Sequence, residues 1–145
     1  MTRAAVLRST SFLGHDTGDH PENPGRIRAI ERELRVRDAL RDRPDVPFDL
    51  ISLDEVGRTH SPRYLAALEQ VTSLGGGWLD ADTFCDSDSL AVARLAAGAS
   101  AAAVDAVLDG TVERAFALGR PPGHHATAGR GMGFCLLNSI AIAAN

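Results

Sequence analysis

The stretch RAFALGRPPGHHA, residues 114–126, joins a short apolar run to two adjacent histidines through a Pro-Pro-Gly frame. The apolar run is predicted to form a β-strand, and in α/β sheets ligands sit beyond the carboxyl ends of the strands. His124 and His125 stand at that place in the sequence. Imidazole titrates near neutral pH, so it can take and return a proton. Position and chemistry together favour a functional role for the pair over a structural one.

Strands and helices are predicted to alternate along the chain. The predicted strands cover residues 4–7, 46–52 and 114–118. The predicted helices begin at Asn23-Pro24 and Ser61-Pro62, run from Ser89 to Asp109 before Gly110, and cover residues 135–145. In the first of them, Ile27, Ile30 and Leu34 recur at helical spacing and are predicted to pack. The turn-rich segment 14–25 is a predicted loop. This alternation predicts an α/β sheet with helices on both faces.

The composition is typical of a single globular domain. The chain has 145 residues, of which 44% are hydrophobic and 23% charged. A net charge of −4 gives no basic face, which argues against nucleic acid as a partner. No run of eighteen apolar residues and no signal peptide is visible, so we expect no membrane partner and a cytoplasmic location. Cys85 and Cys135 are therefore expected to be reduced thiols.

Two further motifs allow a structural and a functional interpretation. In GMGFC, residues 131–135, the glycines form a tight turn or let the backbone approach a ligand, with Phe134 as an apolar wall. Cys135 has no paired acid and is interpreted as inert packing. The acids of LDADTFCDSD, residues 79–88, lack the glycine and terminal Glu of a calcium loop, so a solvated loop is favoured.

The remaining histidines stand in separate segments. His15 and His20 lie among turn residues, where a solvated loop is the expected environment. His60 precedes a predicted helix, where a structural hydrogen bond is expected. Catalytic zinc needs about three protein ligands, and the chain contains neither HExxH nor CxxC. Metal binding by the histidine pair alone is therefore disfavoured, and a different metal site made of the five histidines and several acids is the weakest hypothesis.

Residues 120–144, RPPGHHATAGRGMGFCLLNSIAIAA, resemble the histone deacetylase and acetylpolyamine amidohydrolase family, particularly its bacterial and class II members. HDTGDHPENPGRIRAI is similar to the family's early loop and first helix, THSPRYL to its next helix, and LDADTFCDSDSLAVARLAAGAS to its acidic loop and long helix. The resemblance implies an arginase-like parallel sheet with zinc at the base of a narrow channel. It also implies a hydrolase that removes an acyl group, usually acetyl, from lysine or a polyamine.

The resemblance also assigns roles to residues of the histidine loop and the turn after it. His124 and His125 match the paired active-site histidines, with His125 favoured as general base and His124 as a holder of charge and hydrogen bonds. The carbonyl of Gly133 would accept the substrate amide N–H, and Phe134 would form one wall of the channel.

Two further positions of the family's channel have a match in this sequence. Arg26 matches an arginine of the internal cavity below the metal. Asp80 or Asp82 matches a rim acid that holds the substrate, and the resemblance does not decide between the two.

The family's zinc ligands follow the histidine helix, as an Asp-x-His pair and a later Asp, so the resemblance places them beyond Asn145. We therefore expect residues 1–145 to be the N-terminal part of a single deacetylase domain, an incomplete form of the fold with no metal ligands of its own. Such a chain is expected to be inactive alone. The alternative is a non-catalytic remnant or complementing fragment that acts through protein contacts, with a second chain or as a homo-oligomer.

Overall fold

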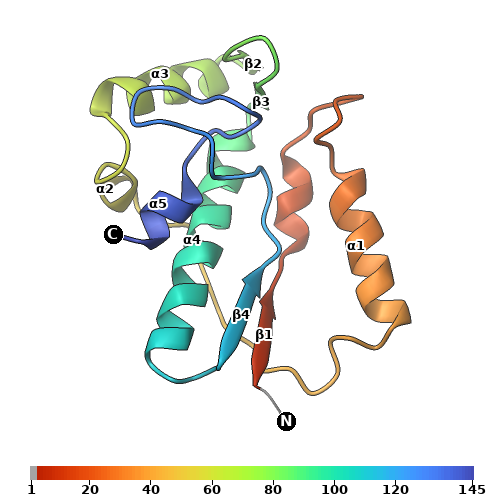
Figure 1. Ribbon diagram of the computed structural model, residues 1–145. Helices are drawn as coiled ribbons and strands as arrows, with labels where there is room; N and C mark the ends of the chain where they lie inside the picture. Colours follow the sequence, from red (N-terminus) through yellow and green to blue (C-terminus); the bar gives the residue numbers. More distant parts are fainter. Residues whose placement is uncertain (1–2) are drawn as a thin grey trace.

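The computed structural model describes residues 3–145 and contains a small parallel sheet (Figure 1). Strand β1 (Ala4–Leu7) pairs in parallel with β4 (Arg114–Ala117), so that Ala4 faces Arg114 and Leu7 faces Ala117. The predicted strands at residues 4–7 and 114–118 are confirmed, the second ending one residue earlier than predicted. Because the strands are parallel, the segments that follow them start from the same end of the sheet.

The long helix α4 (Ser89–Leu108) is the central element of the molecule (Figure 1). It contacts both strands of the sheet and the short helix α5 (Ser139–Ala143). Its length and apolar composition alone would suffice to cross a membrane, but its packing against these elements is that of a core helix. The helix ends at Leu108, and Gly110 follows two residues later. The φ of Gly110, 77°, lies in the left-handed region that favours glycine.

The predicted strand at residues 46–52 is wrong, because this extended segment pairs with no strand among the described residues. Its polar groups bond to α4 instead. The N–H of Ile51 donates to the carbonyl of Arg94 at 3.3 Å, and Nε of Arg94 donates to the carbonyl of Ile51 at 2.8 Å. Gly98 permits this close crossing, because a Cβ there would clash with the carbonyl of Asp49. Pro47 also removes one donor that a strand would need.

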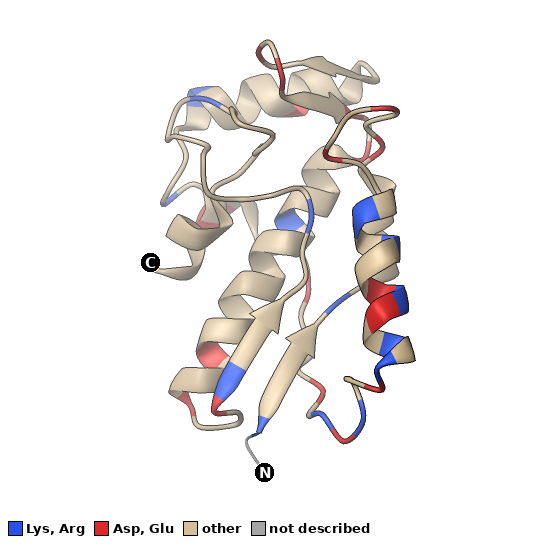
Figure 2. Ribbon diagram, turned by 45° about the vertical axis from the view of Figure 1, so that its right-hand side comes forward, with Lys and Arg blue, Asp and Glu red and all other residues tan. Residues whose placement is uncertain are grey.

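Helix α1 (Gly25–Val36) begins one residue later than predicted. Asn23 still holds its start, since Oδ1 accepts the N–H of Gly25 at 2.8 Å. Of the three residues predicted to pack, Ile27 is buried, Leu34 is half-buried and Ile30 is exposed. Ile27 faces β1 across a cleft of about 660 Å³, whereas Ile30 and Leu34 are not among the residues that line it. Charged residues are frequent along this helix, whereas few lie on α4 (Figure 2).

A β-hairpin that was not predicted packs beside the second predicted helix. Helix α3 (Pro62–Ser73) is capped by Ser61 as expected and follows the short α2 (Leu53–Val56). Strands β2 (Gly76–Trp78) and β3 (Phe84–Asp86) then pair antiparallel. Gly76, with φ of 101°, allows the pairing because a Cβ would clash with the Cys85 carbonyl. The glycine triplet thus begins a strand as well as a turn.

Two apolar clusters support the loops above the sheet. One lies between α4 and the sheet and includes Leu7, Phe12 and Val112. The other lies between α3, α4 and α5 and includes Leu68, Leu136 and Leu137. Leu136 and Leu137 precede α5, which is shorter than the predicted helix at 135–145. The segment between β4 and α5 is therefore anchored at both ends in buried residues.

Candidate active site

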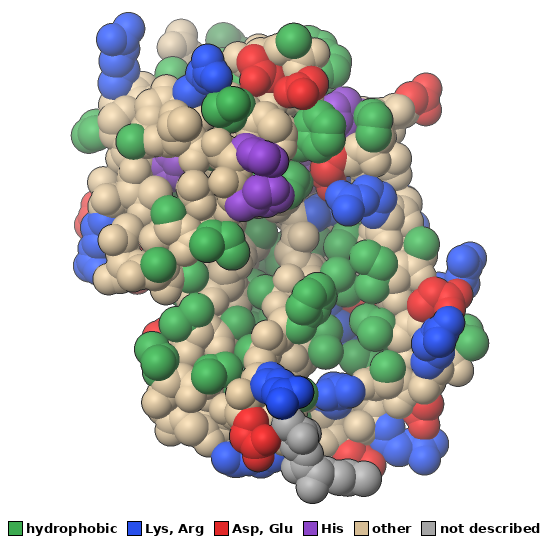
Figure 3. Space-filling model, in the orientation of Figure 1, with side chains coloured by type: hydrophobic (Ala, Val, Ile, Leu, Met, Phe, Trp, Pro, Cys, Tyr) green, Lys and Arg blue, Asp and Glu red, His purple; other side chains and the backbone are tan. Residues whose placement is uncertain are grey.

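His124 and His125 lie side by side on the loop that leaves β4. Their ring centroids are 4.2 Å apart, with 45° between the ring planes. Both residues are exposed, whereas Pro121 before them and Ala126 after them are buried. Two histidine side chains lie in contact near the centre of this face, apart from the other histidines (Figure 3). A small cavity of about 140 Å³ opens beside His124. The imidazoles are thus available to a ligand while their backbone is held in place.

The thiol of Cys135 supports the backbone of both histidines. Its Sγ accepts the N–H of His124 and the N–H of His125, each at 3.4 Å, and its own S–H donates to the carbonyl of Gly133 at 3.4 Å. The residue is fully buried, as its interpretation as packing implied. Its hydrogen bonds to the histidine loop had no signal in the sequence, because ten residues and a turn separate the partners.

Gly133 lies against the ring of His125, and Phe134 follows it in the same turn. A Cβ on Gly133 would come within 2.8 Å of the His125 ring, so only glycine allows this approach. Gly133 and Phe134 both have positive φ, 57° and 68°. For Phe134 this is a strained conformation. The N–H of Phe134 donates to Oγ1 of Thr83 at 3.1 Å, which ties the turn to the β2–β3 hairpin.

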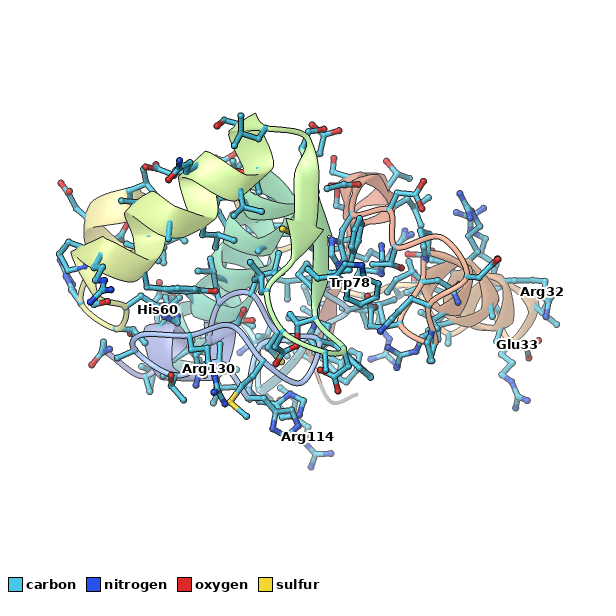
Figure 4. All side chains as sticks on the ribbon, turned by 90° about the horizontal axis from the view of Figure 1, so that it is seen from above. Arg32, Glu33, His60, Trp78, Arg114 and Arg130 are labelled. Atoms are coloured by element: carbon cyan, nitrogen blue, oxygen red, sulfur yellow. The ribbon has the colours of Figure 1, made fainter. Side chains whose placement is uncertain are left out.

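Four aromatic rings form a group that we call the aromatic rim: His20, Trp78, Phe84 and Phe134. The rings of His20 and Phe134 meet edge to face, with centroids 4.6 Å apart. Trp78, which extends from the hairpin (Figure 4), lies 6.2 Å from His20 and 5.2 Å from Phe84. His20 was expected in a solvated loop. Instead, its Nδ1 accepts the N–H of Glu22 and its Nε2 bonds to the carbonyl of Asp82, both at 3.0 Å.

Asp80 and Asp82 shape the loop of the hairpin. Oδ1 of Asp80 accepts the N–H of Asp82 at 3.1 Å and the N–H of Thr83 at 2.8 Å. These bonds, that from Asp82 first, lower the pKa of Asp80, so its carboxylate stays ionised. The carboxylate of Asp82 is exposed and accepts the hydroxyl of Thr83 at 3.3 Å. The assignment of either acid to substrate binding stays a prediction.

A buried polar cluster lies where the histidine loop begins. Arg120 is 2% exposed and makes a bidentate ion pair with Glu22, which is also 2% exposed. Nε2 of His15 lies 3.6 Å from the same carboxylate, and its Nδ1 bonds to the hydroxyl of Ser89 at 2.6 Å. Burial, followed by the charge of Arg120, lowers the pKa of His15 to about 4, so this ring is neutral at pH 7. His15 was expected in a solvated loop but is buried, and no role was predicted for Glu22 or Arg120.

Arg26 lies at the edge of this cluster. Its side chain is 58% exposed, and Nη1 is 3.6 Å from Oε1 of Glu22. It lines neither the 660 Å³ cleft nor the 140 Å³ cavity. Its predicted place in an internal cavity stays a prediction.

His60 has the structural role expected for it. Its ring is buried, and Nε2 accepts the N–H of Asn138 at 2.9 Å. Asn138 caps α5 with Oδ1 and donates from Nδ2 to the carbonyl of Ala126 at 2.9 Å. Burial lowers the pKa of His60, which keeps the ring neutral and able to accept this bond. The far end of the histidine loop is thereby fixed to the segment before α3 (Figure 4).

The described residues lack a complete set of zinc ligands. Catalytic zinc is held by about three protein ligands. Within residues 3–145, no three side chains of His, Cys, Asp or Glu come together in a way that could hold a metal ion. These residues therefore do not form a zinc site by themselves, and the same holds for the alternative metal site made of the five histidines.

The chain is similar in sequence and structure to one group of known proteins. Residues 20–145 match the histone deacetylase domain. A probable deacetylase of Methanothermobacter thermautotrophicus is 45% identical over 139 residues, which cover 95% of this chain and 40% of the relative. Human polyamine deacetylase HDAC10 is 37% identical, with 95% and 22% covered. The crystal structure of the HDA15 HD domain superposes with a TM-score of 0.91 at 33% identity, over 99% of this chain and 43% of that chain. The chain thus spans less than half the length of these relatives.

Proposed function

This chain belongs to the histone deacetylase family, and we propose that it supplies the histidine pair and one channel wall of a zinc-dependent deacetylase domain. The expected reaction is hydrolysis of an acetyl amide on lysine or on a polyamine. The observation that carries the proposal is the exposed pair His124 and His125, whose backbone bonds to the buried Cys135 and whose second ring lies against Gly133.

Each residue of the pair has a task that its position supports. His125 takes a proton from the attacking water and later gives it to the leaving amine, which is general base and acid catalysis by one imidazole. His124, with its ring 4.2 Å away, holds the developing charge and donates a hydrogen bond. The carbonyl of Gly133 accepts the amide N–H of the substrate and so orients the scissile bond.

The channel wall has an apolar and a polar part. Phe134 and His20 form an aromatic corner that excludes water from the methylene chain of an acyl amine. The exposed carboxylate of Asp82 stands beside this corner and attracts a cationic substrate. Zinc chemistry requires ligands other than residues 3–145, so we expect residues 1–145 alone to bind and orient an amide but not to hydrolyse it.

A chimaera tests the proposal. Residues 1–145 replace the matching segment of the Methanothermobacter relative, with which they share 45% identity. We expect this protein to deacetylate an acetyl-lysine peptide or an acetylpolyamine and to lose activity on zinc removal. The remainder of the relative without residues 1–145 serves as control. A folded, zinc-loaded chimaera without turnover on either substrate would contradict the proposal.

A further inference from the structure

We propose that Glu22 and Arg120 are positioning residues, whose buried ion pair holds the loop of His20 against the loop of His124 and His125. The inference rests on the proposed function in that it takes these two histidines to be the active ones. It adds residues that contact no substrate but set the geometry between the aromatic rim and the histidine pair.

The ion pair between Glu22 and Arg120 is bidentate and buried. Nε of Arg120 donates to Oε1 of Glu22 at 2.8 Å, and Nη2 donates to Oε2 at 2.9 Å. Nη1 donates to the carbonyls of Phe12, at 3.1 Å, and His15. The guanidinium is thus held on two sides, and the planar fork matches the carboxylate in both bonds. The pair joins residues that are 98 positions apart in the sequence.

Arg120 stands where the histidine loop begins. It follows Leu118 and Gly119 after the end of β4, and Pro121 and Pro122 come next, whose rings fix the backbone torsion φ. A fixed side chain at this point sets the direction in which the loop leaves the sheet. Cys135 then holds the backbone of His124 and His125 from below.

Glu22 also connects the ion pair to the aromatic rim. Its backbone N–H donates to Nδ1 of His20 at 3.0 Å, while its carboxylate binds Arg120. His20 in turn meets the ring of Phe134 edge to face at 4.6 Å. One residue therefore orients a rim ring through its backbone and secures the histidine loop through its side chain.

The other groups that face the Glu22 carboxylate contribute less. Arg26 is 3.6 Å away but its side chain is 58% exposed, so solvent screens it. His15, at 3.6 Å, is neutral at pH 7. A buried ion pair rarely adds stability over an apolar pair of the same volume, because desolvation offsets the attraction. The physical gain from this pair is a defined geometry, which is what a positioning role needs.

The test uses residues 1–145 and two local readouts. The first is the nuclear Overhauser effect between the rings of His20 and Phe134, and the second is hydrogen exchange of the His124 and His125 amides. In Glu22→Gln we expect loss of the Overhauser effect and roughly tenfold faster exchange at these amides, with the α4 core amide of Ala97 unchanged. The matched control is Glu31→Gln, which removes a carboxylate paired with Arg8 at 2.9 Å on α1 and should change neither readout.

A neutral double variant keeps the test decisive if a lone buried charge prevents folding. Glu22→Gln with Arg120→Met leaves no unpaired charge and should fold, but it should show the same two local losses. If hydrogen exchange became faster by the same factor at Ala97 and at the histidine amides, the ion pair would only stabilise the whole fold. That result would overturn the proposal. Unchanged readouts in the double variant would also overturn it. Neither readout involves turnover, so failure of this inference is distinguishable from failure of the chimaera.

Discussion

The Sγ atom of Cys135 lies 3.4 Å from the backbone nitrogen of His125 and accepts its N–H, and the N–H of His124 points at the same sulfur. A buried thiol thus fixes the backbone of the two exposed histidines. The imidazole side chains, which we expect to act on substrate, remain accessible to solvent.

Replacement of Cys135 should cost more stability than replacement of the other buried cysteine. Cys135→Val leaves two part-buried backbone N–H groups without their acceptor, and each costs up to roughly 1–3 kcal/mol when water does not replace the sulfur. Cys85→Val is the matched control, because that thiol only donates to the carbonyl of Gly77 at 3.5 Å. Urea unfolding of both variants gives the comparison. Equal free energies of unfolding would show that the sulfur bonds contribute little.

Gly133→Ala should displace the ring of His125. The added Cβ would lie 2.8 Å from that ring, and the φ of 57° disfavours any side chain. We expect a loss of about 1–3 kcal/mol in stability. A shifted His125 ring resonance in NMR spectra should accompany it. Gly129→Ala, in the same loop with no atom within 4 Å of the new Cβ, is the control and should leave the His125 resonance in place.

Much of the fold follows from local patterns, and the exceptions have physical reasons. β1, β4, α3 and α4 were predicted from short apolar runs, a Ser-Pro start and an alanine-rich helix that ends at Gly110. The apolar residues within 46–52 are typical of a strand and led to that prediction. The backbone of this segment bonds to Arg94 on α4 instead. Such a choice of partner depends on tertiary packing.

The candidate site likewise has a part that could be predicted from local sequence and a part that could not. His124, His125, Gly133 and Phe134 stand in one continuous stretch, and the structure places the two imidazole rings together with Gly133 against His125. The roles assigned to these residues stay predictions. His20, Glu22 and Arg120 depend on contacts across about a hundred positions, and single-residue patterns carry no record of them. The family resemblance located these loops in the chain without indicating that they touch.

His15 should make stability depend on pH in the acidic range. Its pKa is lowered from 6.5 to about 4, chiefly by burial and then by Arg120. Below pH 6.5 the unfolded chain binds a proton that the folded chain excludes until about pH 4. The stabilisation is therefore complete above pH 6.5 and is lost as the pH falls toward 4, with about 2 kcal/mol lost by pH 5.

Urea unfolding near pH 7 and near pH 5, with His15→Gln alongside, isolates this effect from that of the carboxylates. Glutamine can keep a bond to Ser89 but does not titrate, so the variant should show the smaller pH dependence. Equal pH dependence in the two proteins would mean that His15 is protonated in the folded state as readily as in the unfolded one.

Residues 1–145 should not retain zinc stoichiometrically. No three metal-binding side chains come together within residues 3–145, and two or fewer ligands bind zinc weakly. After dialysis against zinc and then against buffer, metal analysis should find well below one equivalent per chain. Tight binding at one equivalent that His124→Ala abolishes would contradict this expectation and identify a zinc site that includes the histidine loop.

The most direct measurement is the deacetylation rate of the zinc-loaded chimaera with His125→Ala. We expect a fall in kcat of at least about 100-fold, since a positioned general base contributes roughly 10²–10⁴-fold. Arg130→Ala, an exposed residue of the same loop, should keep kcat within about twofold of the unmodified chimaera, an order-of-magnitude allowance for a surface change. A His125→Ala protein that folds, binds zinc and retains its kcat would contradict the assignment of the histidine pair as the catalytic centre.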